Sequence, residues 1–214
     1  SLVGSEMCIR DRMDLVRRDR GHPSIITWVA FNESWGVWHQ SSRPEQRAFV
    51  EGIVRLTQAL DQTRPVVGND GWEFTVGDLW TLHVYKEGSD LSSRINQLIN
   101  EPESLVAGGE GNQAQRIGAL PGANIKNLPI LLTECGGIGF IQNGNGFAYG
   151  DLAGNKRDLE QRIRGAVSVV STNTNLQGYV WTQLTDVQQE INGLLYFDRS
   201  PKLPIGVLHD IFSQ

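Results

Sequence analysis

Cysteine, basic charge and long apolar runs are all scarce in this sequence, and each scarcity excludes a class of protein. The 214 residues include only Cys8 and Cys135, which make neither a disulfide framework nor a metal site. No apolar run approaches the roughly 20 residues that a membrane-spanning helix needs. The net charge is −5 and no basic cluster is present. The sequence therefore predicts neither a membrane nor a nucleic-acid partner.

The first twelve residues, SLVGSEMCIRDR, differ in character from the rest of the chain. They lack the basic start and long apolar centre of a signal peptide. They resemble the translated read-through of a sequencing adapter found in metagenomic assemblies. We therefore expect residues 1–12 to be a non-native segment and residues 13–214 to hold the native sequence.

One stretch, His22–Gly36, organises the rest of the chain. Pro23 biases the preceding residue away from helix, and Ile25 to Phe31 is a nearly unbroken apolar run that predicts a strand buried on both faces. The run stops at Asn32 and Glu33. In parallel α/β folds, ligands and catalysis lie at such carboxyl ends of strands.

Downstream, strand patterns alternate with helical patterns. A helix over Pro44–Leu60 is predicted from Phe49, Ile53, Leu56 and Leu60, with a serine cap before it. The other expected elements are strands over Val66–Gly68, Leu79–Val84, Pro129–Thr133 and Gly178–Thr182, a helix end over Asp14–Arg20, helices around Ile95–Ile99 and Leu159–Val170, and a long loop over Val106–Asn124. Five strands with βα alternation predict an α/β fold with a parallel sheet in one domain.

A second predicted strand also ends on an acid, Glu134, so that Glu33 has a possible partner. Retaining glycoside hydrolysis needs two carboxyl groups about 5 Å apart, one as nucleophile and one as acid/base. In a closed barrel, strand-end acids face each other across the mouth. Metal-dependent enzymes of this architecture also use such acids, and their further ligands would have to be His83 and Asp70.

The sequence around the acids resembles glycoside hydrolase family 2. The segments that carry the resemblance are the fourth-strand signature from His22 to Ser34, the seventh-strand segment from Leu128 to Gly137, the eighth-strand segment from Gly178 to Asp186, and the closing segment Asn192–Leu195 with Asp198 and Arg199. The resemblance covers the chain from about Asp14 onward. It implies strands four to eight of a partial (β/α)8 TIM barrel.

The resemblance also implies roles for individual residues. Glu33 corresponds to the acid/base and Glu134 to the nucleophile that forms the glycosyl-enzyme. The substrate-binding residues that it implies are Asn32 on the sugar 2-hydroxyl, Tyr85 bonded to the nucleophile, Trp181 as an apolar wall under the sugar, and His83 and Trp35 as lining residues. Tyr85 and Trp181 have the alternative of being core aromatic residues. No metal or other cofactor is implied.

The implied function is hydrolysis of a β-linked carbohydrate by a retaining exo-β-glycosidase, most like the β-galactosidases. The Asn-x-Lys motif of glucuronidases is not evident around Asp198–Lys202, which disfavours that activity. The alternatives are a β-mannosidase, an endo-β-glycanase of the same clan, and a non-catalytic carbohydrate-binding pseudoenzyme. Retention of both glutamates argues against the last.

The resemblance implies an enzyme with β-sandwich domains followed by a complete barrel, whereas this sequence begins just before the fourth strand of such a barrel. We expect the parent enzyme to supply the first barrel half and the sandwich domains. Five strands of such a barrel leave unpaired edges, which favour aggregation.

We therefore predict that the 214-residue chain alone folds poorly and is inactive. This chain is compared with an extended protein, which we define as the same chain joined to its upstream sequence recovered from source DNA. The measurements are thermal melting and hydrolysis of nitrophenyl β-glycosides. A soluble monomer of the short chain that melts cooperatively and hydrolyses a glycoside would contradict this prediction.

Overall fold

The computed structural model describes residues 2–107, 115–141 and 146–213. The chain forms two compact units: the first comprises residues 1–82 and 102–130, and the second comprises residues 83–101 and 131–214. Two strands, β3 and β6, have residues in both units. None of the described helices is long and apolar enough to cross a membrane.

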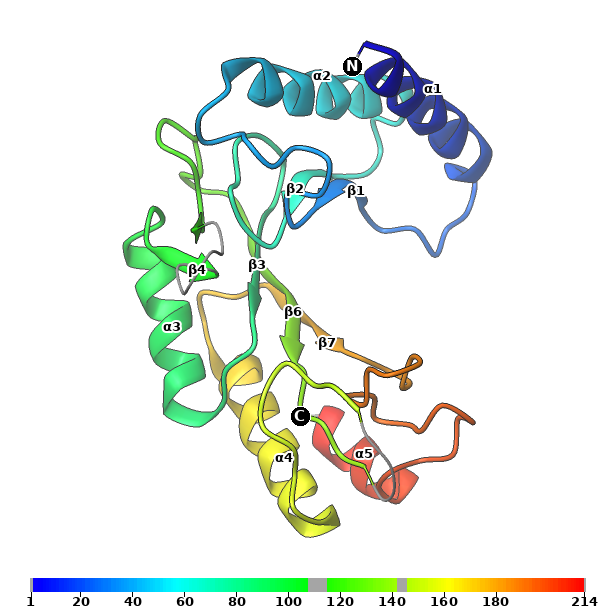
Figure 1. The fold of residues 1–214 in the computed structure, drawn as a ribbon, viewed down its shortest axis with the longest axis vertical. Helices are drawn as coiled ribbons and strands as arrows, with labels where there is room; N and C mark the ends of the chain where they lie inside the picture. The colour runs from blue at the N-terminus through cyan, green and yellow to red at the C-terminus, as the bar shows by residue number, and fades with distance from the viewer. Residues whose placement is uncertain (1, 108–114, 142–145, 214) are drawn as a thin grey trace. The chain divides into compact units, whose positions relative to one another are not determined.

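The first unit packs two helices against a parallel strand pair (Figure 1). Its elements are α1 (Leu2–Asp19), β1 (Trp28–Asn32), α2 (Pro44–Leu60), β2 (Val66–Asp70), β4 (Leu105–Ala107) and β5 (Arg116–Ile117). β1 and β2 pair in parallel, with Asn32 opposite Asp70. Val16, Trp28, Val54 and Val66 form a buried apolar cluster in this unit.

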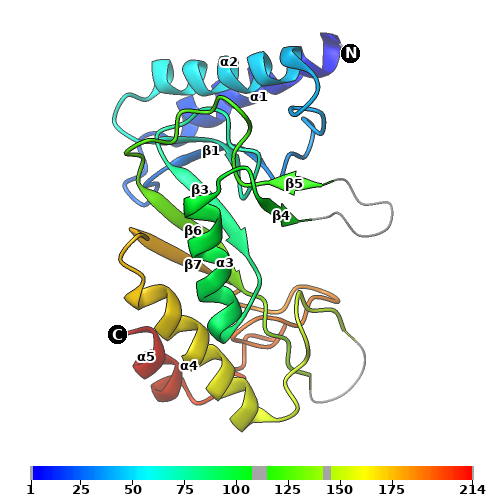
Figure 2. The same ribbon diagram turned by 90° about the vertical axis from the view of Figure 1, so that its left-hand side faces the viewer.

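The second unit is built around the sheet β3–β6–β7, in which β6 is the middle strand. Its elements are β3 (Trp80–Val84), α3 (Gly88–Asn100), β6 (Ile130–Gly136), α4 (Lys156–Thr172), β7 (Gly178–Thr182) and α5 (Ile205–Phe212), with the first residues of β3 and β6 in the first unit. β6 and β7 are parallel. α4 contacts α3, α5 and β7, and Figure 2 shows α3 and α4 as neighbours.

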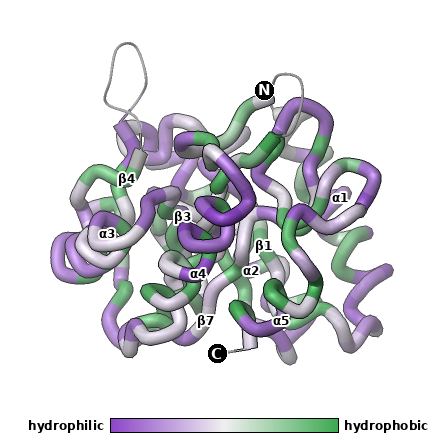
Figure 3. The backbone as a smooth tube through the Cα atoms, turned by 90° about the horizontal axis from the view of Figure 1, so that it is seen from below, coloured by the Kyte–Doolittle hydropathy of each residue, from purple (hydrophilic) through white to green (hydrophobic). Residues whose placement is uncertain are grey.

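The main elements follow the sequence patterns. α2 and β7 have the predicted bounds, and the predicted strand-helix alternation and parallel pairing are confirmed. The helix predicted over Asp14–Arg20 is the end of α1. In Figure 3 the hydropathy colour changes repeatedly along α3, as expected for a helix that buries Leu91, Ile95 and Leu98 on one side.

The serine cap predicted for α2 is wrong. The N-cap is Arg43, and the described residues provide no side-chain hydrogen bond to cap the helix there. The reason is the position of Pro44, which occupies the first turn and so places the cap one residue after the serines.

Two further predictions need correction. β1 is not buried on both faces, because Val29 is 37% exposed and Asn32 is exposed. In the described sheet β1 has β2 as its one neighbour, so one side of the strand lacks a covering strand. The loop expected over Val106–Asn124 contains parts of the antiparallel pair β4–β5, whose strands of three and two residues are too short to give a recognisable pattern. Residues 108–114 of this loop lie outside the described residues.

Asp61 ties the end of α2 to β1 and to the segment just before β2. Its carboxylate accepts hydrogen bonds from Thr63, from Trp28 Nε1 at 2.9 Å and from Arg64 at 2.8 Å. Arg64 also donates to the Ile25 carbonyl, ahead of β1. The hydrogen bonds from Thr63 and then Trp28 hold the pKa of Asp61 well below its ordinary value of 3.8.

A lowered folded-state pKa makes the contribution of Asp61 fully present above its ordinary pKa of 3.8 and lost as the pH falls toward the folded value. We therefore expect Asp61→Asn to lower the urea midpoint of the extended protein at pH 7 and to make the midpoint less sensitive to acidification to pH 3. Asp14→Asn, at an exposed position of α1, is the control. An equal acid sensitivity in Asp61→Asn and the unmodified protein would contradict the assignment.

Candidate active site

In the second unit, neighbouring strands bring three of the predicted site residues together. Glu134 lies on β6, His83 on β3 and Tyr85 just after β3. Tyr85 donates its hydroxyl to Glu134 Oε2 at 2.5 Å, and His83 Nδ1 lies 3.3 Å from the same oxygen. Burial, followed by the hydrogen bond to Glu134, raises the pKa of Tyr85 well above its ordinary range, so the phenol keeps its proton and acts as a donor. The arrangement holds one carboxylate oxygen in a fixed place.

The two glycines after Glu134 are required by the aromatic rings around them. Gly136 has φ +92°, and a Cβ there would lie 2.6 Å from the Trp181 ring. Gly137 has φ +64°, and its Cβ would lie 2.6 Å from Tyr85 and 2.9 Å from Tyr149. Larger residues would meet both backbone strain and ring atoms. The glycine pair therefore lets Tyr85 and Trp181 approach the backbone next to the carboxylate.

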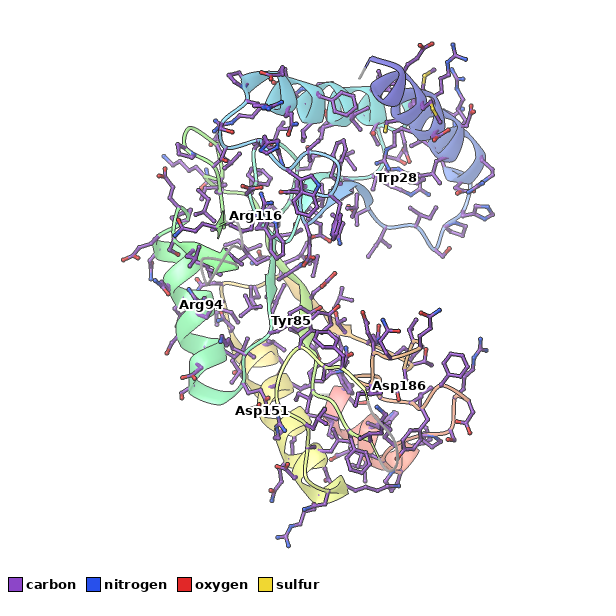
Figure 4. The ribbon with its side chains drawn as sticks, in the orientation of Figure 1. Trp28, Tyr85, Arg94, Arg116, Asp151 and Asp186 are labelled. Carbon is purple, nitrogen blue, oxygen red and sulfur yellow. The ribbon has the colours of Figure 1, made fainter. Side chains whose placement is uncertain are left out.

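The aromatic residues Tyr85 and Trp181 also pack against other rings. Tyr149 stacks on Tyr85 with ring centroids 4.2 Å apart and planes 10° from parallel. Trp181 on β7 is half-buried and contacts Phe212 of α5 edge to face. Figure 4 labels Tyr85 among these side chains. Trp181 thus has a core contact as well as a place over Gly136, and its role as a sugar wall stays a prediction.

In the first unit, the chain turns sharply immediately after β1. Glu33 is not a glycine, yet its φ is 52°, and Ser34 comes next with φ 61°. The amide of Trp35 donates to the Asn32 carbonyl at 2.9 Å and closes the turn, while the Glu33 amide donates to Asp70 of β2 at 3.0 Å. Two consecutive non-glycine residues with positive φ cost about 1–3 kcal/mol each and persist only where surrounding structure holds them.

A buried polar network supplies that support. Ser34 is fully buried; its amide donates to Asn69 Oδ1 at 2.9 Å and its hydroxyl donates to Glu73. Asn69 Nδ2 donates back to the Ser34 hydroxyl at 3.1 Å. Glu73, 1% exposed, pairs with Arg116 at 2.9 Å. Arg116, labelled in Figure 4, also donates to the Trp38 carbonyl at 3.0 Å, so the network holds both ends of the segment from Ser34 to Trp38.

The predicted site residues thus form two groups, one in each unit. Asn32, Glu33 and Trp35 belong to the first unit, and the remaining four belong to the second: His83, Tyr85, Glu134 and Trp181. Taken singly, neither unit contains, among its described residues, three side chains arranged to ligate a metal.

The residues of the buried network are not evident in the sequence. Ser34 closes the fourth-strand signature without a role of its own there, and Glu73 and Arg116 lie 43 residues apart in segments without regular periodicity. Asp70-Gly71-Trp72, whose sequence suits a site wall as well as a loop turn, forms a turn in which Asn69 Nδ2 bonds the Trp72 carbonyl at 2.6 Å. Cys135 is buried and its burial raises the pKa of the thiol to about 12, which agrees with a packing role.

From the buried network we predict how one substitution changes the free energy of unfolding. Arg116→Met leaves the Glu73 carboxylate buried without its cation, and we expect a loss of about 3–5 kcal/mol in the free energy of unfolding of the extended protein. Arg55→Met is the matched control, because Arg55 and Glu51 form an exposed pair on α2 and such pairs contribute about 0–1 kcal/mol. Urea denaturation measures both. Equal losses in the two variants would contradict the role given to the buried pair.

Comparisons with known proteins agree with this architecture. Residues 5–149 match the family model described as glycosyl hydrolases family 2, TIM barrel domain. Among solved structures, a family 2 β-galacturonidase from Eisenbergiella tayi bound to galacturonate has a TM-score of 0.69 at 16% identity, over 98% of this chain and 37% of its own. No curated protein sequence matches significantly.

Two β-glucuronidases are similar to the same extent. The one from Ruminococcus gnavus, in complex with D-glucaro 1,5-lactone, has a TM-score of 0.65 at 16% identity, over 97% of this chain and 36% of its own. The one from Faecalibacterium prausnitzii has a TM-score of 0.66 at 15% identity, over 98% and 35%. The chain thus spans little more than a third of the length of these structures. The predicted fold class, part of a (β/α)8 barrel, is confirmed, and the chain belongs to the glycosyl hydrolase family 2 TIM barrel domain.

Proposed function

We propose that the chain is part of a retaining exo-β-glycosidase, most like the β-galactosidases, in which Glu134 is the nucleophile and Glu33 the acid/base. The observation that carries the proposal is the hydrogen bond of 2.5 Å from Tyr85 to Glu134 in a member of this family. A tyrosine that keeps its proton stabilises an ionised carboxylate, and the nucleophile of a retaining glycosidase must be ionised.

The reaction has two displacements. The Glu134 carboxylate attacks the anomeric carbon while Glu33 gives its proton to the glycosidic oxygen, so that the leaving group departs as an alcohol and a glycosyl ester remains on Glu134. Glu33, now a carboxylate, takes a proton from a water molecule as that water attacks the anomeric carbon. The bond between the sugar and Glu134 breaks, which frees the Glu134 carboxylate. Asn32 donates to the sugar 2-hydroxyl, and Trp181 lies under the sugar ring.

The preference for a neutral sugar rests on Lys202. A uronic acid needs a cation for its carboxylate, and Lys202 is the lysine of the segment where glucuronidases carry the Asn-x-Lys motif. Here Lys202 is fully buried, and its ammonium donates to Asp186 at 2.7 Å and to the Ile191 carbonyl at 2.7 Å. It is therefore engaged inside the unit rather than offered to a substrate.

A β-uronidase is the second candidate function. The observation in its favour is that the similar solved structures include a β-galacturonidase and β-glucuronidases. The identities of 15–16% make this a likeness of fold. The two candidates differ in the charge of the glycone, which an assay separates directly.

The test compares the extended protein with its Glu134→Gln variant on nitrophenyl β-galactoside, β-mannoside, β-glucuronide and β-galacturonide. We expect turnover of the galactoside with retained configuration by NMR, and a loss of kcat of about 10⁴-fold or more in the variant. Glu103→Gln, at an exposed position, should keep the unmodified rate. Turnover of the uronides alone would favour the second candidate, and a folded protein without turnover of any sugar would favour a binding module.

The role of Glu33 has a separate signature. Glu33→Ala should lose about 10²–10⁴-fold on substrates with a poor leaving group, and much less on a dinitrophenyl glycoside, whose leaving group needs no proton. Added azide should restore turnover and give a β-glycosyl azide, because the small anion attacks the glycosyl ester without a base. An equal loss on both classes of substrate, without azide rescue, would contradict the assignment.

A further inference from the structure

We propose that Trp35 and Trp38 form the subsite for the leaving group of the substrate, and that this group is a six-membered ring with a flat apolar face. The inference rests on the proposed function, because it takes Glu33 as the acid. An aromatic ring and the C–H face of a pyranose share this chemistry, and substrates of the two kinds distinguish them.

The two tryptophans make an open aromatic corner. Trp35 is 63% exposed and Trp38 is 40% exposed, unusual values for the largest apolar side chain. Their ring centroids lie 4.5 Å apart and the planes are 71° from parallel. One ring therefore offers a face where the other offers an edge, and a flat ring can stack on one while contacting the other.

Buried groups hold the Trp38 ring and the backbone of the corner, so the segment that carries both rings is preorganised. Arg116 lies over the Trp38 ring, 5.0 Å from its centroid, and donates to the Trp38 carbonyl. Between the tryptophans, Val37 is buried, and its amide donates to the Ser34 carbonyl at 2.9 Å. Ser34 is itself anchored by Glu73 and Asn69. Little loop freedom remains to be lost on binding, which favours a ligand contact.

The position of the corner is set by the turn that carries Glu33. The bond from the Trp35 amide to the Asn32 carbonyl brings these residues within about 7 Å, with Glu33 at the bend. The acid delivers its proton to the oxygen that joins the sugar to the leaving group, so the leaving group must lie beside Glu33 in the reacting complex. The Trp35–Trp38 corner belongs to the same rigid turn, which fits it for that group.

The experiment measures kcat/KM of the extended protein for three substrates with the same glycone: a glycosyl fluoride, an aryl glycoside and a disaccharide. Trp35→Ala should lower kcat/KM up to about tenfold for the aryl glycoside, the disaccharide or both, the size of one lost ring contact, and should leave the fluoride within about twofold. Trp35→Phe should restore most of the loss. Ile26→Ala, at a 79% exposed position of the same unit, is the control and should change none of the three.

The pattern of losses decides the inference. A loss confined to the aryl glycoside supports an aromatic leaving group, and a loss on the disaccharide supports a sugar. Equal losses on all three substrates, or unchanged values on all three, would overturn the subsite. Failure of the unmodified protein to hydrolyse the fluoride would overturn the proposed function, and the subsite with it.

Discussion

The buried carboxylate of Glu73 is the constraint on which the first unit depends. A charge removed from water is tolerated only where a cation and hydrogen bonds replace the lost hydration. Arg116 and Ser34 supply these contacts; Ser34 lies in the loop after β1 and Arg116 in β5. Because one carboxylate needs both partners, the loop after β1 and the segment at β5 are fixed relative to the turn after β2. The strained turn at Glu33 is a consequence of that fixation.

The second unit also contains a buried ion pair, and it holds a second acid that is only partly buried. Lys202 is enclosed, and its pairing with Asp186 opposes a burial that by itself lowers the pKa of the amine. Asp186 also accepts from the Gly193 amide at 2.8 Å, so the pair joins the segment after β7 to the chain before α5. Glu134, by contrast, keeps 26% of its side chain exposed while Tyr85 and His83 contact Oε2. The enclosed ion pair thus fixes the loops, and the partly exposed acid stays accessible to solvent.

Local sequence patterns are sufficient to predict the helices and strands and the acids at the strand ends. They are not sufficient to predict the residues that hold those acids in place. Helical spacing locates α2, and β-branched residues locate β7, because both signals are contained within a short window. The α5 helix is not predicted, since its eight residues give little periodicity. Glu73 and Arg116 cannot be recognised, because a buried ion pair is defined by a partner in another part of the fold. Tyr85 is expected beside Glu134 from the family resemblance, and composition alone leaves it as a possible core residue.

Glu33 and Glu134 also differ in the backbone conformation at and after each residue. After Glu134 the left-handed conformations fall on Gly136 and Gly137, where they cost little, and the space of the missing side chains is taken by Trp181 and Tyr85. At the other acid they fall on Glu33 itself and on Ser34, where each is strained. A glycine in place of Ser34 would relieve the strain but would remove the hydroxyl that bonds Glu73 and Asn69. The contacts of the serine therefore come at the expense of local conformational energy, and they fix the turn that carries the acid.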